Sequence, residues 1–388
     1  MILYNAQIFT ENDVFEPGYI EIAGPKIVDI VLGDNASKDF SSNQLKNYDS
    51  QEIIDCSGSY IIPGLIDIHF HGCNGHDFCE GSTEAIFEIA KYQAMHGILA
   101  ICPATMTYTE ELLMPTMNAA KQYDCDKWAD LVGINMEGPF ISPDKVGAQN
   151  PKYVQKPNYE MIKRLDEVSG GLVKLVDIAP EVNGAMEFID MAADDFAISI
   201  AHTCTDYDTA KQAYKKGARH LTHTYNAMPG ITHRAPGPIP AAAEEGASAE
   251  IICDGKHIHY ASVRLIFKYF SKDKVCLISD SCEATGLADG KYMLGGQEVI
   301  KQDGKAVLAH DTNTIAASVT NLFDCLKHAI FDAGILMEDA ILAATKNPAK
   351  AIGIEDTYGQ ISVDRHANLL VVDKDFNIQH IVKNGRIL

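Results

Sequence analysis

The chain has 388 residues, of which 46% are hydrophobic and 22% charged, and its formal net charge is −21 at pH 7. This length exceeds what a single hydrophobic core usually holds, so we expect either one large barrel with a small accessory domain or two domains. The negative charge repels phosphate and argues against nucleic acid or an anionic membrane as a partner. An anionic small substrate would therefore need cations placed locally.

Targeting signals and disulfides are also not expected. No apolar run approaches the ~20 residues of a membrane span, and the start of the chain has neither a basic segment nor a small-residue cleavage site. The ten cysteines contain no Cys-x-x-Cys pair and are scattered, as reduced thiols used for packing are. We expect a soluble protein that stays in the cytoplasm.

The first 57 residues predict a small β domain. Short alternating strands at 6–10 and 19–22 are separated by polar turns, and a polar, exposed loop is expected at 33–50. From residue 359 onward strands return, at 367–373 and 378–382, followed by an Asn384-Gly385 turn. We expect them to complete the N-terminal strands, which gives domain boundaries of 1–57, 58–355 and 356–388.

Between these ends, apolar strands alternate with amphipathic helices. The eight predicted strands are 61–71, 97–105, 130–137, 172–179, 196–202, 218–224, 249–253 and 274–280. The predicted helices are 83–96, 110–124, 158–168, 183–193, 206–216 and 260–270. Strands that are apolar on both faces and alternate with helices indicate a parallel sheet, and eight such units close a barrel. The predicted fold class is α/β: a (β/α)8 TIM-like barrel with a small β-sandwich domain built from both termini.

The last part of the barrel region departs from this alternation. Residues 288–309 have the pattern of a hairpin, with turns at Gly295-Gly296 and Asp303-Gly304, and we predict that they form a flap at the mouth of the barrel. Two helices are predicted beyond it, at about 314–333 and 338–352.

Polar residues stand at the carboxyl ends of several predicted strands, where the active site of such a barrel forms. His69 and His71 end the first strand and, being two apart in an extended segment, are expected to share a face with Asp67. The pair alone is weak evidence, since His257 and His259 form a second one. Its weight comes from the other strand ends, which carry Glu137, His202, His223 and Asp280.

Four histidines and two carboxylates facing one mouth are typical of one or two divalent metal ions, with Zn or Fe favoured by imidazole. For any one of these histidines, a purely structural position in the core is the simpler explanation. It does not explain why all of them, together with two carboxylates, stand at the strand ends of one barrel. A divalent metal makes a hydroxide available at neutral pH and polarises a carbonyl, which favours a hydrolase acting on an amide or ester. Asp280 is the candidate for proton transfer to the leaving group, although it could also be only a metal ligand or a helix cap.

Beyond these residues, the chain resembles the amidohydrolase superfamily over essentially its whole length. Within it, the chain is similar to the family that deacetylates N-acetylglucosamine 6-phosphate. The motifs that carry the resemblance are PGLIDIHFHG at 63–72, EGPF at 137–140, AHT at 201–203, LTHTYNAM at 221–228, DGKH at 254–257 and SD at 279–280. Glu137, where many relatives use a carboxylated Lys, and the Asn-Ala-Met segment favour this family over relatives such as the dihydroorotases.

The resemblance implies a role for each residue of the centre. Glu137, His202 and His223 would hold the main metal ion, and Asp280 would be the acid/base. Some members lack the first-strand histidines and bind one ion. Because His69 and His71 are present here, a second ion bridged by Glu137 is allowed.

The resemblance also implies the substrate contacts. His257 would contact the substrate and polarise the acetyl carbonyl. The main chain at Asn226 and Ala227 and the guanidinium of Arg234 would bind the phosphate, the arginine reaching across the interface of a homodimer. Gln149 stands where some members carry a substrate-contacting histidine, so the kind of contact it makes is open.

Three functions remain as hypotheses. The favoured one is metal-dependent hydrolysis of N-acetylglucosamine 6-phosphate to glucosamine 6-phosphate and acetate. The second keeps the chemistry but changes the substrate to the galactosamine epimer or to another N-acyl compound, such as an N-acyl amino acid. The third is a scaffold of the same fold that has lost its metals. That hypothesis predicts missing metal ligands, whereas this chain has a histidine or a carboxylate at every expected ligand position.

Overall fold

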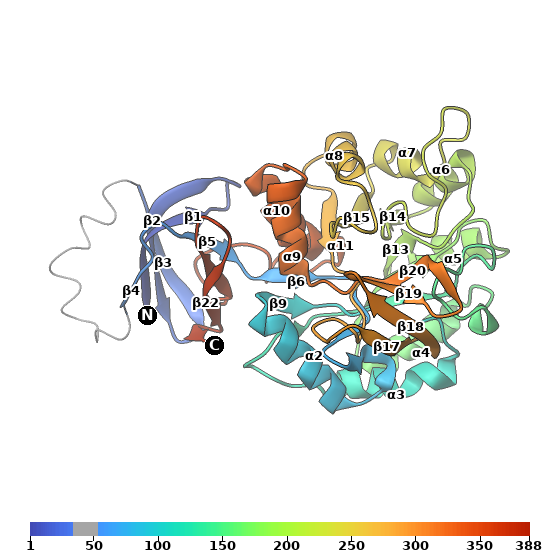
Figure 1. Ribbon diagram of the computed structural model, residues 1–388, viewed down its shortest axis with the longest axis horizontal. Coiled ribbons are helices and arrows are strands. Elements are labelled where there is room, and N and C mark those ends of the chain that lie inside the picture. The colour runs from blue at the N-terminus through green and yellow to red at the C-terminus, as the bar shows by residue number, and fades with distance from the viewer. Residues whose placement is uncertain (34–52) are drawn as a thin grey trace.

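The computed structural model describes residues 1–33 and 53–388, so most of the predicted polar loop lies outside the described residues. Strands from both chain ends form one sheet at one end of the molecule, and the strands and helices between them form a larger body beside it (Figure 1). Within the described ranges, no helix has both the length and the apolar character that crossing a membrane requires.

The larger body contains eight short parallel strands in the predicted chain order. They are β6 (Leu65–Asp67), β9 (Ile98–Ile101), β11 (Ile134–Phe140), β12 (Val173–Ile178), β13 (Ala197–Ile200), β14 (Ala218–Leu221), β15 (Ser248–Ile252) and β16 (Val275–Ile278). β6 pairs with β9, and β11 to β16 pair in sequence. β10 (Asp130–Leu131) extends the β9 side of the sheet.

Contacts outside the regular strand pairs close the ring. Ala104 and Asn135 form a parallel bridge between the β9 and β11 segments. On the opposite side, the N–H of Asp280, after β16, donates to the carbonyl of His69, after β6, at 2.9 Å. The prediction of an eight-stranded α/β barrel is confirmed.

Helices cover the barrel on the outside. They are α2 (Thr83–Met95), α3 (Glu110–Gln122), α4 (Tyr159–Ser169), α5 (Ala185–Ala192), α6 (Tyr207–Lys215), α7 (Pro238–Glu244), α8 (Tyr260–Tyr269), α9 (Leu322–Lys327), α10 (Met337–Ala344) and α11 (Lys346–Ala351). Single turns lie at η3 (Phe78–Glu80), η4 (Pro151–Tyr153) and η5 (His328–Asp332). Several begin where predicted because a side chain caps them: Ser82, Asn158 and Asp206 accept from the N–H groups at the starts of α2, α4 and α6.

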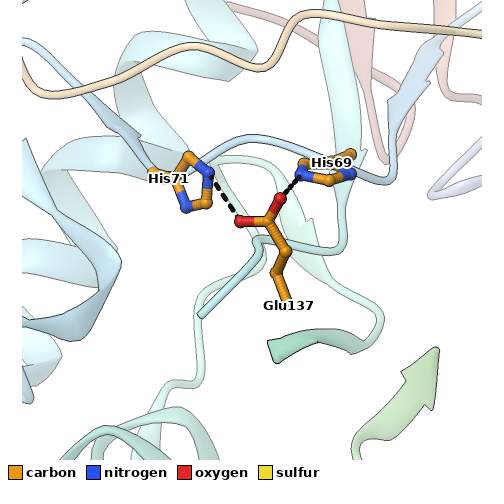
Figure 2. A group of neighbouring side chains, drawn as sticks. All are labelled: His69, His71 and Glu137. Atoms are coloured by element: carbon orange, nitrogen blue, oxygen red, sulfur yellow. Dashed lines mark ion pairs between the residues drawn. The ribbon is translucent and has the colours of Figure 1, made fainter. Parts of the chain in front are cut away.

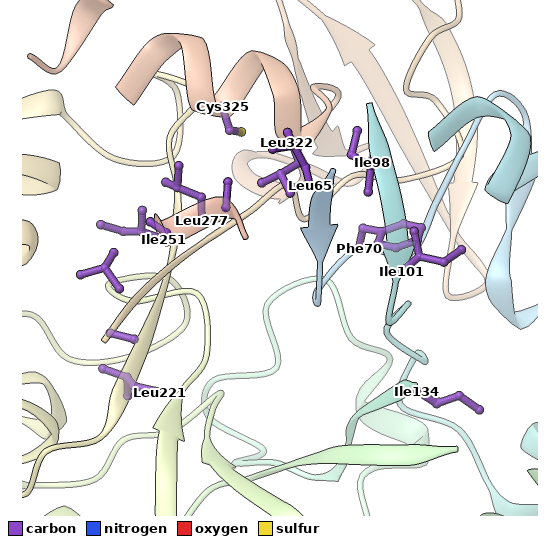
Figure 3. Packing of buried hydrophobic residues seen from close by; sticks show 14 of the residues in the cluster. Leu65, Phe70, Ile98, Ile101, Ile134, Leu221, Ile251, Leu277, Leu322 and Cys325 are labelled. Atoms are coloured by element: carbon purple, nitrogen blue, oxygen red, sulfur yellow. The ribbon is translucent and has the colours of Figure 1, made fainter. Parts of the chain in front are cut away.

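The main core lies between the strands and these helices. Figure 3 shows Leu65 of β6 and Leu277 of β16 close to Leu322 and Cys325 of α9, all in one buried cluster. A smaller buried cluster contains Ile66, Ala100 and Cys276 from the strands. It also contains Ala349 of α11 and Ile352, which follows that helix. With apolar side chains on both faces, the strands are held rigidly, and so are the polar residues that come after them.

The terminal sheet has eight strands. They are β1 (Ile2–Phe9), β2 (Phe15–Ala23), β3 (Lys26–Leu32), β4 (Ile53–Asp55), β5 (Tyr60–Pro63), β21 (Leu369–Val372), β22 (Ile378–Lys383) and β23 (Arg386–Ile387). β5 lies between β1 and β21, so the two chain ends are joined in one mixed sheet. The prediction that both termini build this small domain is confirmed. The domain boundaries themselves stay a prediction.

The first predicted strand, 61–71, is wrong as a single element. It divides at Gly64 into β5 of the terminal sheet and β6 of the barrel. A Cβ at Gly64 would lie 2.6 Å from a Leu99 side-chain carbon, so the chain crosses between the two sheets at a point with no room for a side chain. His69 and His71 lie beyond β6, followed by a small hairpin of β7 (Gly72–Cys73) and β8 (His76–Asp77).

The predicted hairpin at 288–309 is confirmed but is larger. β17 (Gly290–Leu294), β18 (Gln297–Gln302), β19 (Lys305–Leu308) and β20 (Asp311–Ala317) form a four-stranded antiparallel sheet, which we call the flap. The helix predicted from 314 is therefore wrong at its start, since Thr314 and Ile315 are β-branched residues in β20. The helix begins only at Leu322, with Asn321 as its cap.

The predicted helix 338–352 is likewise two helices. α10 and α11 meet at Thr345, whose φ of −135° and ψ of −82° are not helical. Pro348 comes three residues later and has no N–H to continue a helical hydrogen-bond ladder.

Candidate active site

Two histidines that follow β6 and a glutamate inside β11 come together at the mouth of the barrel. His69 Nε2 lies 3.4 Å from Glu137 Oε1, and His71 Nε2 lies 3.3 Å from Glu137 Oε2. Figure 2 shows the carboxylate of Glu137 between the two rings. All three side chains are buried. We call His69, His71 and Glu137 the first metal group.

A second group uses the same carboxylate. His202 follows β13 and His223 follows β14, and their Nε2 atoms lie 3.0 and 3.1 Å from Glu137 Oε1. The two Nε2 atoms are 3.1 Å apart. We call Glu137, His202 and His223 the second metal group. The candidate ligand atoms of each group lie within 4.8 Å of one another.

The backbone turns sharply at three of these strand ends. The φ angles of His202, His223 and Asp280 are +42°, +26° and +49°, in the left-handed region that side chains other than glycine rarely adopt. Such a conformation costs on the order of 1–3 kcal/mol per residue and persists only when the surroundings impose it. The hydrogen-bonded segments just beyond the strands impose it here and direct His202 and His223 toward Glu137 and Asp280 toward His71.

The electrostatics keep the shared carboxylate charged. Burial alone would raise the pKa of Glu137, but the nearby rings of His71, His202 and His223 hold that pKa well below its ordinary value. A carboxylate that stays ionised can accept positive charge on both of its oxygens, which is what a bridging ligand needs.

These residues fit a divalent metal. Imidazole nitrogens and a carboxylate are the donors that Zn and Fe prefer. Each group brings three such donors together, and His69 Nε2 is buried without a hydrogen-bond partner among the described residues, although it lies in the first metal group. The five predicted residues form a buried cluster consistent with a divalent metal site, while their roles as ligands and the identity of the metal stay predictions.

Asp280 lies beside the first metal group. Its Oδ1 is 3.5 Å from His71 Nε2 and 4.0 Å from His69 Nε2. The residue follows β16, as expected, and lines the cavity above the two groups. It can therefore reach both a ligand and a molecule in the cavity.

A cavity of about 470 Å³ opens above the metal groups, which is large enough for a phosphorylated sugar. The end of β11, the loops after β13 and β14, and the flap all contribute to its walls. The predicted substrate residues Asn226, Ala227, His257 and Gln149 line it. Arg234 does not belong to the lining described for this chain and is exposed on the loop before α7.

Gln149 points at the centre rather than at open space. Its Oε1 accepts from the N–H of Thr107 at 2.7 Å, and its Nε2 donates to Glu137 Oε2. Asn226 is partly engaged as well, since its main-chain N–H donates to the carbonyl of His223 at 2.9 Å. Ala227 has a φ of +49°, and its carbonyl accepts from the N–H of Thr203.

His257 is held by a neighbouring carboxylate. Its Nδ1 lies 2.7 Å from Asp254 Oδ2. Burial disfavours the protonated ring, but the hydrogen bond and charge of Asp254, together with the charge of Asp280, outweigh it and raise the pKa of His257 above its ordinary value. With Nδ1 bonded to Asp254, the Nε2 side of the ring is the side available to the cavity.

Sequence reasoning missed a layer of residues behind the ligands. Glu250, in the middle of β15, contacts His69, His220 and the main chain of His223. Asp67, which the sequence analysis named only as a neighbour of the two histidines, accepts from the hydroxyl of Ser279 and so connects β6 to the segment after β16. A charged residue inside an apolar strand with no solvent face was the available signal for Glu250.

Together, the parallel barrel and the two groups that share Glu137 define a metal-dependent hydrolase. Residues 60–388 match the model of the Amidohydrolase family. The chain is 32% identical over 394 residues to N-acetylglucosamine-6-phosphate deacetylase of Bacillus subtilis (strain 168), covering 100% of this chain and 96% of that one.

A solved structure gives the same result. A variant of N-acetyl-D-glucosamine-6-phosphate deacetylase from Mycobacterium smegmatis, in complex with N-acetyl-D-glucosamine-6-phosphate, superposes with a TM-score of 0.90 at 28% identity over 100% of this chain and 98% of that one. N-acetylgalactosamine-6-phosphate deacetylase of Escherichia coli O157:H7 is 27% identical over 84% of this chain and 87% of its own. The chain belongs to the amidohydrolase family and, within it, to the N-acetylglucosamine-6-phosphate deacetylases.

Proposed function

We propose that this chain hydrolyses the N-acetyl group of N-acetyl-D-glucosamine 6-phosphate, giving D-glucosamine 6-phosphate and acetate. The observation that carries the proposal is the pair of metal groups sharing Glu137 at the floor of a cavity of about 470 Å³. Because the chain belongs to the N-acetylglucosamine-6-phosphate deacetylases, we assign the N-acetyl amide of that sugar as the bond that is hydrolysed.

We propose two divalent ions, Zn or Fe. His69, His71 and Glu137 would hold one, and Glu137, His202 and His223 the other. When bound, such an ion lowers the pKa of a water molecule and polarises a carbonyl. Glu137, whose carboxylate faces all four rings, would hold the two positions in register.

Asp280 is proposed as the acid/base. Its carboxylate would take a proton from the attacking water as the water oxygen bonds to the acetyl carbon. It would then deliver that proton to the amide nitrogen as the C–N bond breaks, which leaves acetate and the free amine. Two observations support this role: its Oδ1 is 3.5 Å from His71 Nε2, and the residue lines the cavity.

The remaining residues would hold the substrate. His257 would donate from Nε2 to the acetyl oxygen, and Gln149, fixed by Thr107 and Glu137, would face the same end of the sugar. Asn226 and Ala227 would receive the phosphate. Arg234 would reach the phosphate from the partner chain of a homodimer, which is consistent with its exposure outside the cavity of its own chain.

The galactosamine epimer is the second candidate substrate, because an N-acetylgalactosamine-6-phosphate deacetylase is among the relatives. Purified, metal-loaded protein should be given both N-acetylhexosamine 6-phosphates, their unphosphorylated forms and an N-acetyl amino acid, and acetate release should be measured. The proposal requires the highest kcat/KM for the glucosamine compound. A higher kcat/KM for the galactosamine compound would mean that the protein is an N-acetylgalactosamine-6-phosphate deacetylase. If protein with full metal content released no acetate from any compound, deacetylation would be rejected.

A further inference from the structure

Glu250 is a fully buried carboxylate that no step of the proposed reaction uses. Its Oε2 accepts from His69 Nδ1 at 2.9 Å and from the main-chain N–H of His223 at 3.1 Å. Its Oε1 lies 3.0 Å from His220 Nε2. One carboxylate therefore contacts a member of each metal group from behind (first group, His69; second group, His223).

Both oxygens of Glu250 are engaged, although the residue lies in an apolar strand of the core. A buried polar contact adds little to stability compared with apolar packing, so stability alone does not account for a glutamate at this position.

For His69, the contact decides which ring nitrogen can bind a metal. A hydrogen bond to Glu250 requires the proton to be on Nδ1, which leaves the Nε2 lone pair directed at Glu137, 3.4 Å away. A carboxylate behind a metal-binding histidine fixes the tautomer and the ring orientation and also raises the basicity of the ligating nitrogen.

For His223, the contact holds the backbone. The N–H of His223 donates to Glu250 Oε2, and the N–H of the next residue, Thr224, donates to the Glu250 carbonyl at 3.0 Å. These two bonds enclose the residue whose φ is +26°. They hold the turn after β14 that directs the His223 ring toward Glu137.

We propose that Glu250 is a positioning residue shared by the two metal groups: it sets the tautomer of His69 in one and the backbone turn of His223 in the other. The inference rests on the metal sites of the proposed function but not on the sugar. It requires that loss of the Glu250 charge weakens both sites together.

The test is metal binding by Glu250→Gln. The single oxygen of glutamine can take the place of Oε2, but it is neutral, so its hydrogen bonds to His69 Nδ1 and to the His223 N–H lose their charge assistance and weaken. The glutamine amide then faces His220. Metal-free protein titrated with Co²⁺, followed by its visible absorption, and with Zn²⁺ against a chelator should show both sites weakened, the first metal group by about 10- to 100-fold. Circular dichroism and thermal unfolding would establish that the variant is folded.

Asp177→Asn is the matched control. Asp177 is also a fully buried barrel carboxylate, but it is bonded to Thr222, and among the described residues no hydrogen bond or ion pair joins its side chain to a member of either metal group. Its metal affinities should change less than about twofold. Parental affinity of Glu250→Gln at both sites, loss confined to one site, or an equal loss in Asp177→Asn would each overturn the proposal.

A second measurement covers a Glu250 variant that does not fold. In the parent protein labelled with [¹⁵N]histidine, the His69 signal, identified by its loss in His69→Gln, should show a proton on Nδ1 in a strong hydrogen bond. A proton on Nε2 instead would reject the proposal. Failure of the function is separable: a parent protein that binds both ions but releases no acetate rejects deacetylation and leaves this inference intact.

Discussion

The floor and the rim of the cavity are built in different ways. The floor consists of buried side chains in or just after barrel strands, and two of its rings are held from behind: His69 by Glu250, and His202 by the carbonyl of Lys145, 2.8 Å from its Nδ1. The rim consists of loops and the flap, joined by single contacts such as that of Gln297 Nε2 with the carbonyl of Ala148 at 2.6 Å. We therefore expect the chemistry to depend on the barrel and the choice of substrate to depend on the segments added to it.

The floor and the rim also differ in whether one chain supplies all their predicted residues. The floor brings all its predicted residues together within one chain. The rim does not, because Arg234, the cation expected at the phosphate, is exposed away from the cavity. Floor substitutions should therefore act on metal and turnover, and rim substitutions on the choice and binding of substrate.

The largest effect is expected from the floor. His202→Ala removes one of the three donors of the second metal group, so both metal content and activity should collapse, whereas His69→Ala should chiefly deplete the first metal group. Elemental analysis and acetate release measure the two. His310→Ala, an exposed histidine next to the flap strands, should change neither. Full metal and full turnover in His202→Ala would show that the centre is misplaced.

Asp280→Asn should come next. Asparagine keeps the size and hydrogen bonding of aspartate but cannot carry a proton, and general acid/base help is typically worth 10²- to 10⁴-fold. Turnover should fall by at least about 100-fold while substrate binding survives. Turnover and metal content should be measured across added Zn²⁺. Recovery to near the parental rate would mean that Asp280 is only a ligand.

The rim should show smaller, substrate-dependent effects. Loss of a charge-assisted contact between Arg234 and phosphate should cost roughly 1.5 to 3 kcal/mol, so Arg234→Ala should lose about tenfold or more in kcat/KM for the phosphorylated sugar. The unphosphorylated sugar should change little. Arg219→Ala, an exposed arginine on β14, is the control. Equal losses for both sugars would reject the phosphate contact.

Mixing subunits tests whether Arg234 acts across an interface. If it does, a heterodimer of Asp280→Asn and Arg234→Ala chains contains one site with both native residues, because each chain supplies what the other lacks. Mixed and reassociated protein should then exceed the activity of either variant alone. Activity equal to the average of the two would place Arg234 and Asp280 in the same chain's site.

The smallest effect concerns pH. The pKa of His257 is raised, so its ring stays protonated to higher pH than the ring of a free histidine. The stability that the His257–Asp254 pair contributes is fully present below the ordinary pKa of histidine and is lost as the pH rises through the raised pKa. Asp254→Asn removes the partner, so the alkaline limb of kcat/KM should move to lower pH, with a few-fold loss near pH 7. If the alkaline limb of the kcat/KM profile did not shift in Asp254→Asn, protonated His257 would have no role in the reaction.

Much of the floor could be predicted from the sequence. The apolar segments ending in His202 and His223 are strands by composition, and parallel strands in a barrel place their carboxyl ends at one mouth, so strand order is enough to bring these residues together. The alternation of strands and helices predicted the barrel, and the returning strands after residue 359 predicted the sheet of both termini.

Only the tertiary structure decided the rest. The division at Gly64 depends on Leu99 of the neighbouring strand, and the strand character of Thr314 and Ile315 depends on pairing with β19. The role of Glu250 depends on His69, 181 positions away across the barrel interior. Local sequence determines which residues favour a strand and which side chains stand at its carboxyl end. Which atoms meet inside the barrel is determined by the closed ring of strands, because side chains from distant segments share one small, water-excluded space.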